Sequence, residues 1–280
     1  IPDEEIKNEI CESNPYGKWV EDQVVDLEKI SDFPHEPEIL SDLIPRMQSF
    51  GYTTETMQFM LLPLVTELRD PLGSMGNDAA LACLSDKPRL LYDYFKQLFA
   101  QVTNPAIDSI REEVIMSLEC LIGPEKNLLE SKPENANRLR VKNPILSNNE
   151  LQGITKLKGQ GWKAKKIDIT YSKIDGHDGM VQRLDDICSE AENASDKGYG
   201  FIILTDKKID KDRIAISSLL ACSTVNNHLI NSQKRKKVGI ILESGEAREV
   251  HHHCLLFGYG ADAINPYLAF EAIWQYKIDG

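Results

Sequence analysis

The second half of the chain alternates between short apolar runs and longer amphipathic stretches. Ile167, Ile169 and Tyr171 alternate with polar residues, which is the pattern of a strand with one buried face. The runs at 201–204 and 238–242 are apolar throughout, as is typical of strands that are buried on both faces. The remaining pattern predicts a strand at 261–264 and helices at 181–194, 213–233, 246–257 and 268–276. Strands and helices that alternate roughly every 35 residues predict βαβ crossovers and a parallel sheet.

The first half predicts helices separated by breaks. Thr53-Thr54-Glu55 supplies a cap and an acidic residue for a helix at 53–68. One apolar stripe predicts a core-packed helix at 90–102, and a further helix is expected at 106–118. Loops are expected at 72–78 and 101–105, followed by a connector rich in Pro, Asn and Lys at 123–149.

Four βα units resemble half of an eight-fold (β/α) barrel, although an open three-layer sheet produces nearly the same pattern. The fold class that we predict is α/β. It consists of parallel βα units in an incomplete (β/α) barrel-like domain, preceded by a mainly helical segment.

The net charge of −12 lies mostly in the first 44 residues. These carry 13 acidic residues and three lysines, whereas residues 45–280 carry 31 acidic and 29 basic residues. A nearly neutral body lacks the basic footprint of a nucleic-acid-binding protein, so we expect no nucleic-acid partner. The acidic leader has too little apolar surface to fold alone, so we expect it to pack on something else or to end a preceding domain. Because the chain begins with Ile1, we interpret it as a fragment or a processed product.

No apolar run is long enough to span a membrane, and the first residues lack the pattern of a secretion signal. The six cysteines lie at least 32 residues apart, so no iron–sulfur or zinc clip is predicted. Such scattered cysteines are typical of reduced core thiols, which predicts an intracellular, reducing compartment, either the cytoplasm or an organelle.

Polar residues follow the predicted strands, where parallel α/β folds gather their functional groups. These are Asp206, Glu243 with Glu246, and Asn265. They are candidates for catalysis on a small substrate, but charges at such points also mark where the chain emerges into solvent. The polar stretch 243–249 further suggests a cap or an ion-pair cluster at a helix start.

Two other runs favour structural interpretations. Consecutive residues on a helix point about 100° apart, so His251-His252-His253 does not predict a metal site. Lys234-Arg235-Lys236-Lys237 is the pattern of a solvated helix end, with nuclear import or phosphate binding as weaker alternatives. Since no nucleotide-binding, hydrolase or metalloprotease motif occurs, we predict no catalytic, cofactor-binding or metal residue.

Long blocks of the sequence closely resemble the central domain of glutamate synthase. They include Asp70-Pro-Leu-Gly-Ser-Met-Gly-Asn-Asp78, residues 84–105, Leu242-Glu-Ser-Gly-Glu-Ala-Arg-Glu-Val-His-His252 and residues 258–272. The leader, with Asn14-Pro-Tyr-Gly-Lys-Trp19, resembles the tail of that enzyme's glutaminase domain. The resemblance implies a glutaminase tail at 1–44 and a central domain at 45–280. The latter divides into a helical and loop part at 45–122, a connector at 123–150 and βα units at 151–280.

The resemblance also implies a function. In that family the central domain is non-catalytic, joins the glutaminase domain to the synthase domain that carries FMN and a 3Fe–4S cluster, and helps to form an ammonia tunnel. The complete enzyme makes L-glutamate from L-glutamine and 2-oxoglutarate. No cofactor is expected in this chain, and its expected partners are the two neighbouring domains of the same polypeptide.

Three residues of this chain match the tunnel loops of the family, namely Met75, Thr103 and Asn104. An apolar Met can narrow a passage, while a hydroxyl and an amide can hydrogen-bond neutral ammonia without protonating it. Two alternatives stay open: an autonomous barrel-type enzyme that uses Asp206, Glu243 or Asn265, and a purely structural spacer.

Overall fold

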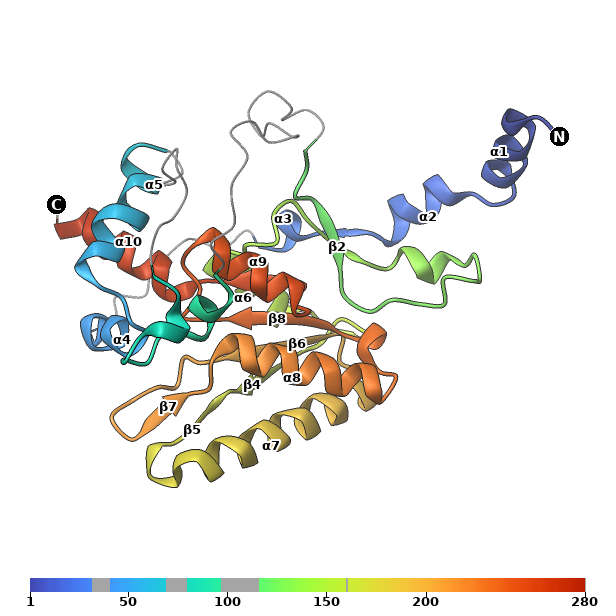
Figure 1. The fold of residues 1–280 in the computed structure, drawn as a ribbon. Coiled ribbons are helices and arrows are strands. Elements are labelled where there is room, and N and C mark those ends of the chain that lie inside the picture. Colours follow the sequence, from blue (N-terminus) through green and yellow to red (C-terminus); the bar gives the residue numbers. More distant parts are fainter. Residues whose placement is uncertain (32–40, 69–79, 97–115, 160, 280) are drawn as a thin grey trace.

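A computed structural model describes residues 1–31, 41–68, 80–96, 116–159 and 161–279 (Figure 1). The α-helices are α1 (Asp3–Glu12), α2 (Tyr16–Gln23), α3 (Leu27–Ile30), α4 (Leu43–Ser49), α5 (Leu62–Thr66), α6 (Asn148–Lys156), α7 (Gly176–Asp196), α8 (Ser218–Asn231), α9 (Val250–Gly258) and α10 (Tyr267–Asp279). The π-helix η1 (Thr56–Leu61) precedes α5, and short 3-10 turns are η2 (Ala82–Leu84), η3 (Leu91–Phe95), η5 (Pro133–Ala136), η6 (Lys173–Asp175) and η7 (Arg235–Lys237). The strands are β1 (Val25–Asp26), β2 (Cys120–Ile122), β3 (Leu139–Val141), β4 (Ala164–Asp168), β5 (Thr170–Ser172), β6 (Phe201–Thr205), β7 (Arg213–Ala215), β8 (Gly239–Glu243) and β9 (Ala263–Asn265).

The centre of the molecule is a parallel sheet with the strand order β4-β6-β8-β9. All five residues of β6 and of β8 are buried, which confirms the prediction from their continuous apolar runs. The α/β class and the parallel sheet predicted from the sequence are therefore confirmed.

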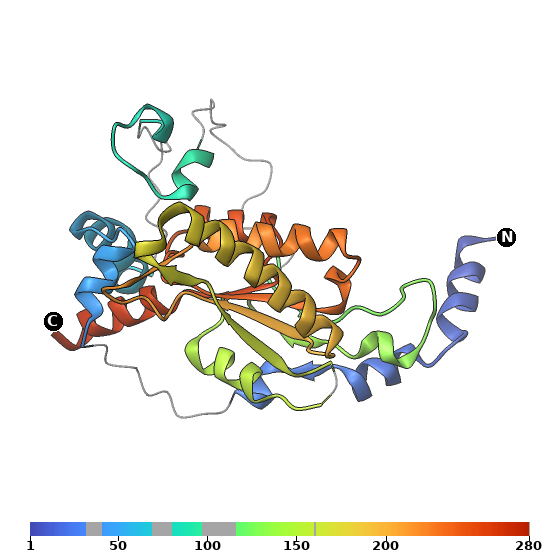
Figure 2. The ribbon, with the colours of Figure 1, turned by 90° about the horizontal axis from the view of Figure 1, so that it is seen from below.

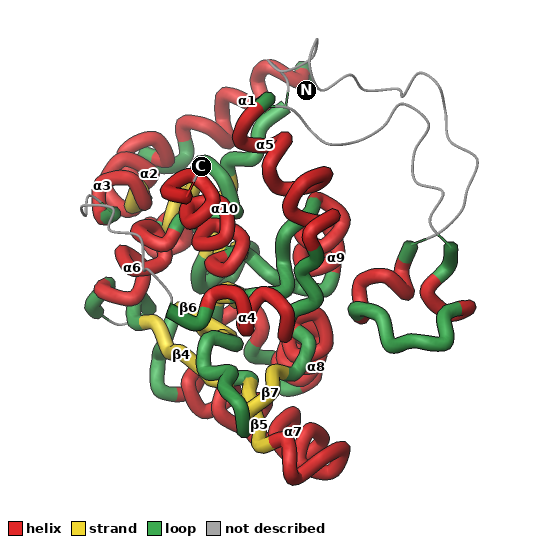
Figure 3. The backbone as a smooth tube through the Cα atoms, turned by 90° about the vertical axis from the view of Figure 1, so that its left-hand side faces the viewer, coloured by secondary structure: helices red, strands yellow, loops and turns green. Residues whose placement is uncertain are grey.

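The barrel part of the prediction is not confirmed. The strands follow one another in sequence order, as in an arc of a barrel, and α7, α8 and α9 cover one face (Figures 1 and 3). The other face, which would line a barrel, is covered by α3, α6 and the small sheet β1-β3-β2 (Figure 2). In the described residues the sheet is thus the middle of three layers.

The leader contributes to the covering layer. β1 pairs with β3, and Leu27 is buried in the same cluster as Leu151 and Ile154 of α6. A Cβ at Gly153 would come within 3.0 Å of the carbonyl oxygen of Ile30, so a glycine there allows α3 to lie against α6. The expectation that the leader packs on something else is confirmed for residues 25–30, which pack on this chain's own body.

Several predicted elements need correction. Helix 53–68 is confirmed as η1 followed by α5, but helix 90–102 is wrong over residues 90–96, where only the short turn η3 forms. The physical reason is that Tyr92 is completely buried whereas Tyr94 is half exposed, so the apolar residues do not share one face. Residues 116–118 of the predicted helix 106–118 are not helical, and the rest of that helix lies outside the described residues, as do the predicted loops.

Two further expectations are only partly met. The connector 123–149 contains β3 and the start of α6, because Ser147 begins a helix there. All six cysteines are free thiols, but Cys11, Cys83 and Cys254 are exposed, so the core description holds only for Cys188 and Cys222. None of the helices within the described residues is long and apolar enough to cross a membrane.

Helix α6 starts with a complete capping box, whose removal should be measurable. The Ser147 Oγ accepts a hydrogen bond from the backbone N–H of Glu150, whose carboxylate accepts one from the backbone N–H of Ser147. We expect Ser147→Ala to lower the free energy of unfolding by about 1 kcal/mol in urea titrations. Ser232→Ala, at the end of α8, is the control and should change it by less than about 0.5 kcal/mol. An equal effect of both substitutions would contradict the capping role.

Candidate functional site

The polar residues predicted at the strand ends meet at one edge of the sheet, as parallel strands require. Asp206 follows β6, and Ser244 to Glu246 follow β8. With Ser218 of α8 and Arg248 they form what we call the strand-end cluster: Asp206, Ser218, Ser244, Glu246 and Arg248. Every member is at least nine-tenths buried, so the interpretation that these charges mark an exit into solvent is wrong.

Asp206 lies at the centre of this cluster and is completely buried. Its two carboxylate oxygens accept the backbone N–H of Gly245 at 3.0 and 2.8 Å, and the Ser218 hydroxyl lies 3.4 Å from Oδ2. Burial raises the pKa of Asp206 to about 7, although the Gly245 N–H acts in the opposite direction. Asp206 therefore holds a proton over part of the neutral pH range.

Glu246 joins the β8–α9 turn to the start of α8. It accepts hydrogen bonds from the Ser217 hydroxyl at 3.0 Å and from the Ser218 N–H at 2.8 Å. A carboxylate at this place satisfies a free N–H of the helix and lies at the positive end of its dipole. The predicted cluster at a helix start is confirmed, but the helix that Glu246 caps is α8 and not the one that follows it. Burial raises the pKa of Glu246 as well.

Arg248 brings positive charge to the cluster and connects it to the first half of the chain. Its guanidinium donates to the carbonyl oxygens of Phe50, Gly51 and Glu246 at 2.9, 3.1 and 3.2 Å. The same group lies over the ring of Tyr52, 4.3 Å from its centroid. Sequence reasoning did not single out Arg248, since its partners lie about two hundred residues away.

Phe50 packs so closely on the turn after β8 that Gly245 has no room for a side chain. A Cβ there would lie 2.4 Å from the nearest atom of the Phe50 ring. At Gly245 the space beside the turn between β8 and α9 is therefore filled by the ring of Phe50.

The other two candidates face the opposite side of the sheet. Glu243 is paired with Lys166 of β4 at 3.0 Å. Asn265 donates to the carbonyl of Leu146 and to Asn148, both at 2.9 Å. Glu243 and Asn265 are thus engaged in internal bonds and do not converge with Asp206 on a common point.

The histidine run 251–253, for which the sequence predicted no metal site, is bonded within the fold. His251 donates to the carbonyl of Tyr92 at 3.0 Å, His252 pairs with Glu249 at 2.9 Å, and His253 donates to the carbonyl of Glu249 at 2.8 Å. No group of three or more His, Cys, Asp or Glu side chains suited to a metal ion occurs in the part of the chain that the structure describes.

In the basic run, the first two residues form ion pairs. Lys234 contacts Glu192 and Asp196 at 2.8 and 2.7 Å, and Arg235 contacts Asp262 at 2.9 Å. Both residues follow the end of α8, but their side chains are only 19% and 21% exposed, so the prediction of a solvated helix end is wrong for these two residues.

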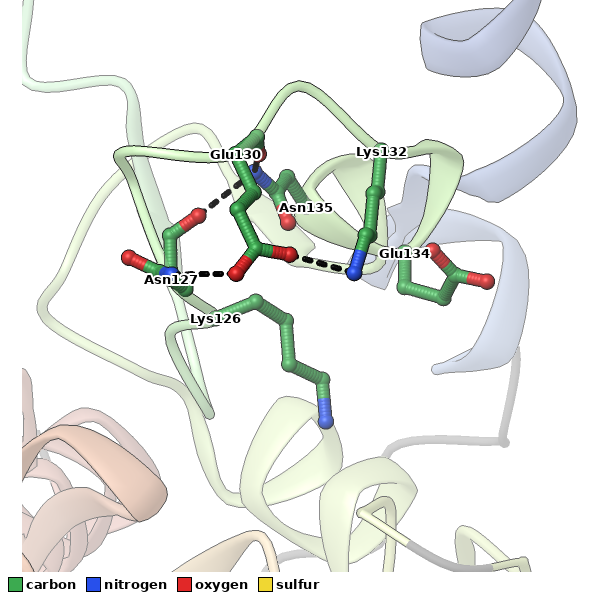
Figure 4. A pocket seen from close by; sticks show the side chains of 6 residues that line it. All are labelled: Lys126, Asn127, Glu130, Lys132, Glu134 and Asn135. Carbon is green, nitrogen blue, oxygen red and sulfur yellow. Dashed lines mark hydrogen bonds and ion pairs between the residues drawn. The ribbon is translucent and has the colours of Figure 1, made fainter.

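A surface hollow of about 370 Å³ lies in the loop that connects β2 to β3 (Figure 4). Its walls are Lys126, Asn127, Glu130, Lys132, Glu134 and Asn135. Asn127 donates to Glu130 at 2.9 Å, Glu130 pairs with Lys132, and Asn135 donates to the carbonyl of Asn127 at 3.1 Å. These polar groups chiefly hold the loop together.

The three residues predicted to line a tunnel, Met75, Thr103 and Asn104, lie outside the described residues. Within the described residues the geometry defines a parallel α/β domain whose strand-end carboxylates are bonded internally.

Comparison with known proteins gives this domain a family. A sequence model described as the glutamate synthase central domain matches residues 45–280. The chain therefore belongs to the glutamate synthase central domain family.

The chain is also similar to several complete glutamate synthases. It is 45% identical to "Glutamate synthase [NADPH] large chain" of Bacillus subtilis, over 100% of this chain and 18% of that protein. It is 43% identical to "Glutamate synthase [NADH]" of Schizosaccharomyces pombe, over 98% of this chain and 14% of that protein. For "Ferredoxin-dependent glutamate synthase, chloroplastic" of Spinacia oleracea the identity is 38%, over 98% of this chain and 17% of that protein. The chain thus spans less than a fifth of the length of these relatives.

Proposed function

We propose that this chain is the non-catalytic central segment of a glutamate synthase that makes L-glutamate from L-glutamine and 2-oxoglutarate. The observation that carries the proposal is the family match over residues 45–280. The strand-end carboxylates support the non-catalytic role, because Asp206 and Glu246 are buried and hydrogen-bonded within the fold.

In this proposal residues 1–44 end the glutaminase domain and residues 45–280 link it to the synthase domain. The FMN and the 3Fe–4S cluster belong to that neighbouring synthase domain, so this chain supplies no group to the redox chemistry. Six free thiols support a reducing intracellular compartment, either the cytoplasm or an organelle.

Met75, Thr103 and Asn104 are proposed to line the passage for ammonia. Neutral ammonia needs hydrogen-bond partners that do not protonate it, and Thr103 and Asn104 have side chains of this kind. An apolar thioether such as Met75 can narrow the passage while staying adaptable.

The proposal predicts that Met75→Trp in the complete enzyme separates its two activities. Filling the passage should lower glutamine-dependent glutamate formation about tenfold and leave ammonia-dependent formation near its wild-type rate, because only delivery is obstructed. Both rates are measured at saturating 2-oxoglutarate. Met116→Trp is the control, since Met116 is half exposed to solvent, and it should leave the ratio unchanged.

If the ratio of the two rates in Met75→Trp equals that of the wild type, the tunnel assignment is wrong. The domain would then act as a spacer between its neighbours.

A further inference from the structure

Tyr92 attaches residues 80–96 to the rest of the protein. This segment lies on the outer side of α8 and α9 (Figures 2 and 3). Leu84, Tyr94 and Phe95 are 76%, 50% and 37% exposed, whereas Tyr92 is 0% exposed. Leu90 and Leu91 pack on the same core but remain partly accessible. Tyr92 is therefore the deepest point at which this segment enters the body.

The place that receives Tyr92 is made by residues that follow β8, and we call it the Tyr92 socket: Glu246, Glu249, His251 and His252. The ring of His252 lies against the ring of Tyr92, with the centroids 4.4 Å apart and the planes tilted by 36°. His251 donates to the backbone carbonyl of Tyr92 at 3.0 Å. Burial and the nearby carboxyl of Glu246 raise the pKa of Tyr92, and the buried Tyr92 hydroxyl makes no hydrogen bond within the described residues.

Glu249 ties the socket to the end of the segment. Its carboxylate contacts His252 at 2.9 Å and Lys96 at 3.4 Å, and Lys96 also pairs with Asp93. His252 and Lys96 lower the pKa of Glu249 to about 2, so the carboxylate stays charged at any physiological pH. The segment is thus held at Tyr92 and again four residues later at Lys96.

The position of this segment along the chain gives the attachment a functional meaning. Residues 80–96 stand between residues 69–79, which contain Met75, and residues 97–115, which contain Thr103 and Asn104. A displacement of residues 80–96 would move one end of each of these two stretches. Displacements of about 1 Å in positioning elements can reduce turnover a hundredfold.

We propose that Tyr92, seated in the socket of Glu246, Glu249, His251 and His252, is a positioning residue for ammonia transfer. It acts by fixing the segment from which the two proposed tunnel stretches depart. The inference rests on the proposed function, and it assigns a role to a residue that touches neither ammonia nor a cofactor.

The test is Tyr92→Ala in the complete enzyme, with two independent readouts. The first is the rate of tryptic cleavage at the Arg89–Leu90 bond, which should rise at least about tenfold because loss of the buried ring frees the segment. The second is the ratio of glutamine-dependent to ammonia-dependent glutamate formation, which should fall at least about fivefold. Tyr92→Phe keeps the ring against His252 and should stay within about twofold of the wild type in both readouts.

Leu151→Ala is the matched structural control. Leu151 is a buried side chain of α6, in the cluster on the other face of the sheet and within the central segment. Its substitution should destabilise the protein without changing the ratio of the two activities. A similar fall in the ratio in Leu151→Ala would mean that general destabilisation causes the effect, and would overturn the proposal.

Met75→Trp, measured beside these variants, separates the two proposals. If it changes the ratio while Tyr92→Ala does not, the positioning role is overturned and the proposed function stands. A second outcome is faster cleavage at Arg89 in Tyr92→Ala together with a wild-type ratio of the two activities in Tyr92→Ala and in Met75→Trp. This outcome overturns both the positioning role and the tunnel assignment.

Discussion

Raising the pH from 5 to 8 is expected to destabilise the wild-type protein by about 3 kcal/mol relative to its Asp206→Asn variant. The pKa of Asp206 is about 7 in the folded protein and near 3.8 in an unfolded chain. Between these values the folded state holds a proton that the unfolded state has lost. The contribution of Asp206 to stability is therefore complete at low pH and is lost as the pH rises through about 7.

The hydrogen bonds around Asp206 suit the protonated form. A protonated Oδ2 can donate to the hydroxyl of Ser218, which in turn lies 2.7 Å from the hydroxyl of Ser244, while the Gly245 N–H lies 3.0 Å from Oδ1 and 2.8 Å from Oδ2. An asparagine carries no charge and can keep the bond from Gly245 to Oδ1. Ionisation places a second buried negative charge beside Glu246. Urea unfolding of both proteins at pH 5 and at pH 8 measures the difference.

The comparison between variants is needed because the ionisation of other buried groups changes the stability in the opposite direction as the pH rises. Burial lowers the pKa of His252 and of His253, so their contribution to stability grows as the pH rises through about 6.5. Glu249, with a pKa of about 2, contributes no change between pH 5 and pH 8. Glu243→Gln is the control, because it neutralises a strand-end carboxylate that is paired with Lys166. An Asp206→Asn variant with the same pH dependence as the wild type would show that Asp206 is ionised throughout.

The sequence predicted the parts of the fold that are decided locally. Strands β6 and β8 were found because the runs 201–204 and 238–242 are apolar throughout, as is typical of strands that are buried on both faces. The predicted helix failed over residues 90–96 because Tyr92, which lies off the apolar stripe, is the side chain that is completely buried, and its partner His252 lies far along the sequence. The choice between a barrel and three layers likewise depended on α3 and α6 reaching one face of the sheet.

For the candidate site, the sequence identified polar residues at strand ends but not their surroundings. A carboxylate after a buried strand has the same local pattern whether it reaches water or stays buried. Asp206 stays buried because Gly245 and Ser218 arrive from other βα units to bond it. Arg248 was missed since the carbonyls that it binds, those of Phe50 and Gly51, carry no signal in the sequence.

Arg248→Ala is expected to lower the free energy of unfolding at pH 8 by about 3–5 kcal/mol. The substitution leaves the carbonyl oxygens of Phe50 and Gly51 without their donor and uncovers the ring of Tyr52. It also removes positive charge from beside the buried Glu246. The free energy of unfolding of Arg248→Lys should lie between those of the wild type and of Arg248→Ala. One ammonium group cannot reproduce the planar guanidinium, which bonds the carbonyls of Phe50 and Gly51 and stacks on the ring of Tyr52.

Arg140→Ala is the matched control for urea unfolding. Arg140 is 36% exposed and pairs with Asp26 at 3.4 Å, so its loss should cost less than about 1 kcal/mol. An equally small cost for Arg248→Ala would show that the Phe50 and Gly51 carbonyls find other donors.

The loss of stability caused by Arg248→Ala should itself depend on pH, because Arg248 lies in the same cluster of buried carboxyls as Asp206. Arg248 lowers the pKa of Glu246, so without it Glu246 keeps its proton to higher pH. At pH 5 the buried carboxyls of Asp206 and Glu246 hold protons more readily than at pH 8. The loss of the positive charge of Arg248 then lowers the free energy of unfolding by less than at pH 8. We therefore expect a smaller loss of stability at pH 5, measured in the same urea titrations. Equal losses at the two pH values would show that Arg248 stabilises the cluster through its carbonyl bonds and its packing on Tyr52, and that its charge contributes nothing.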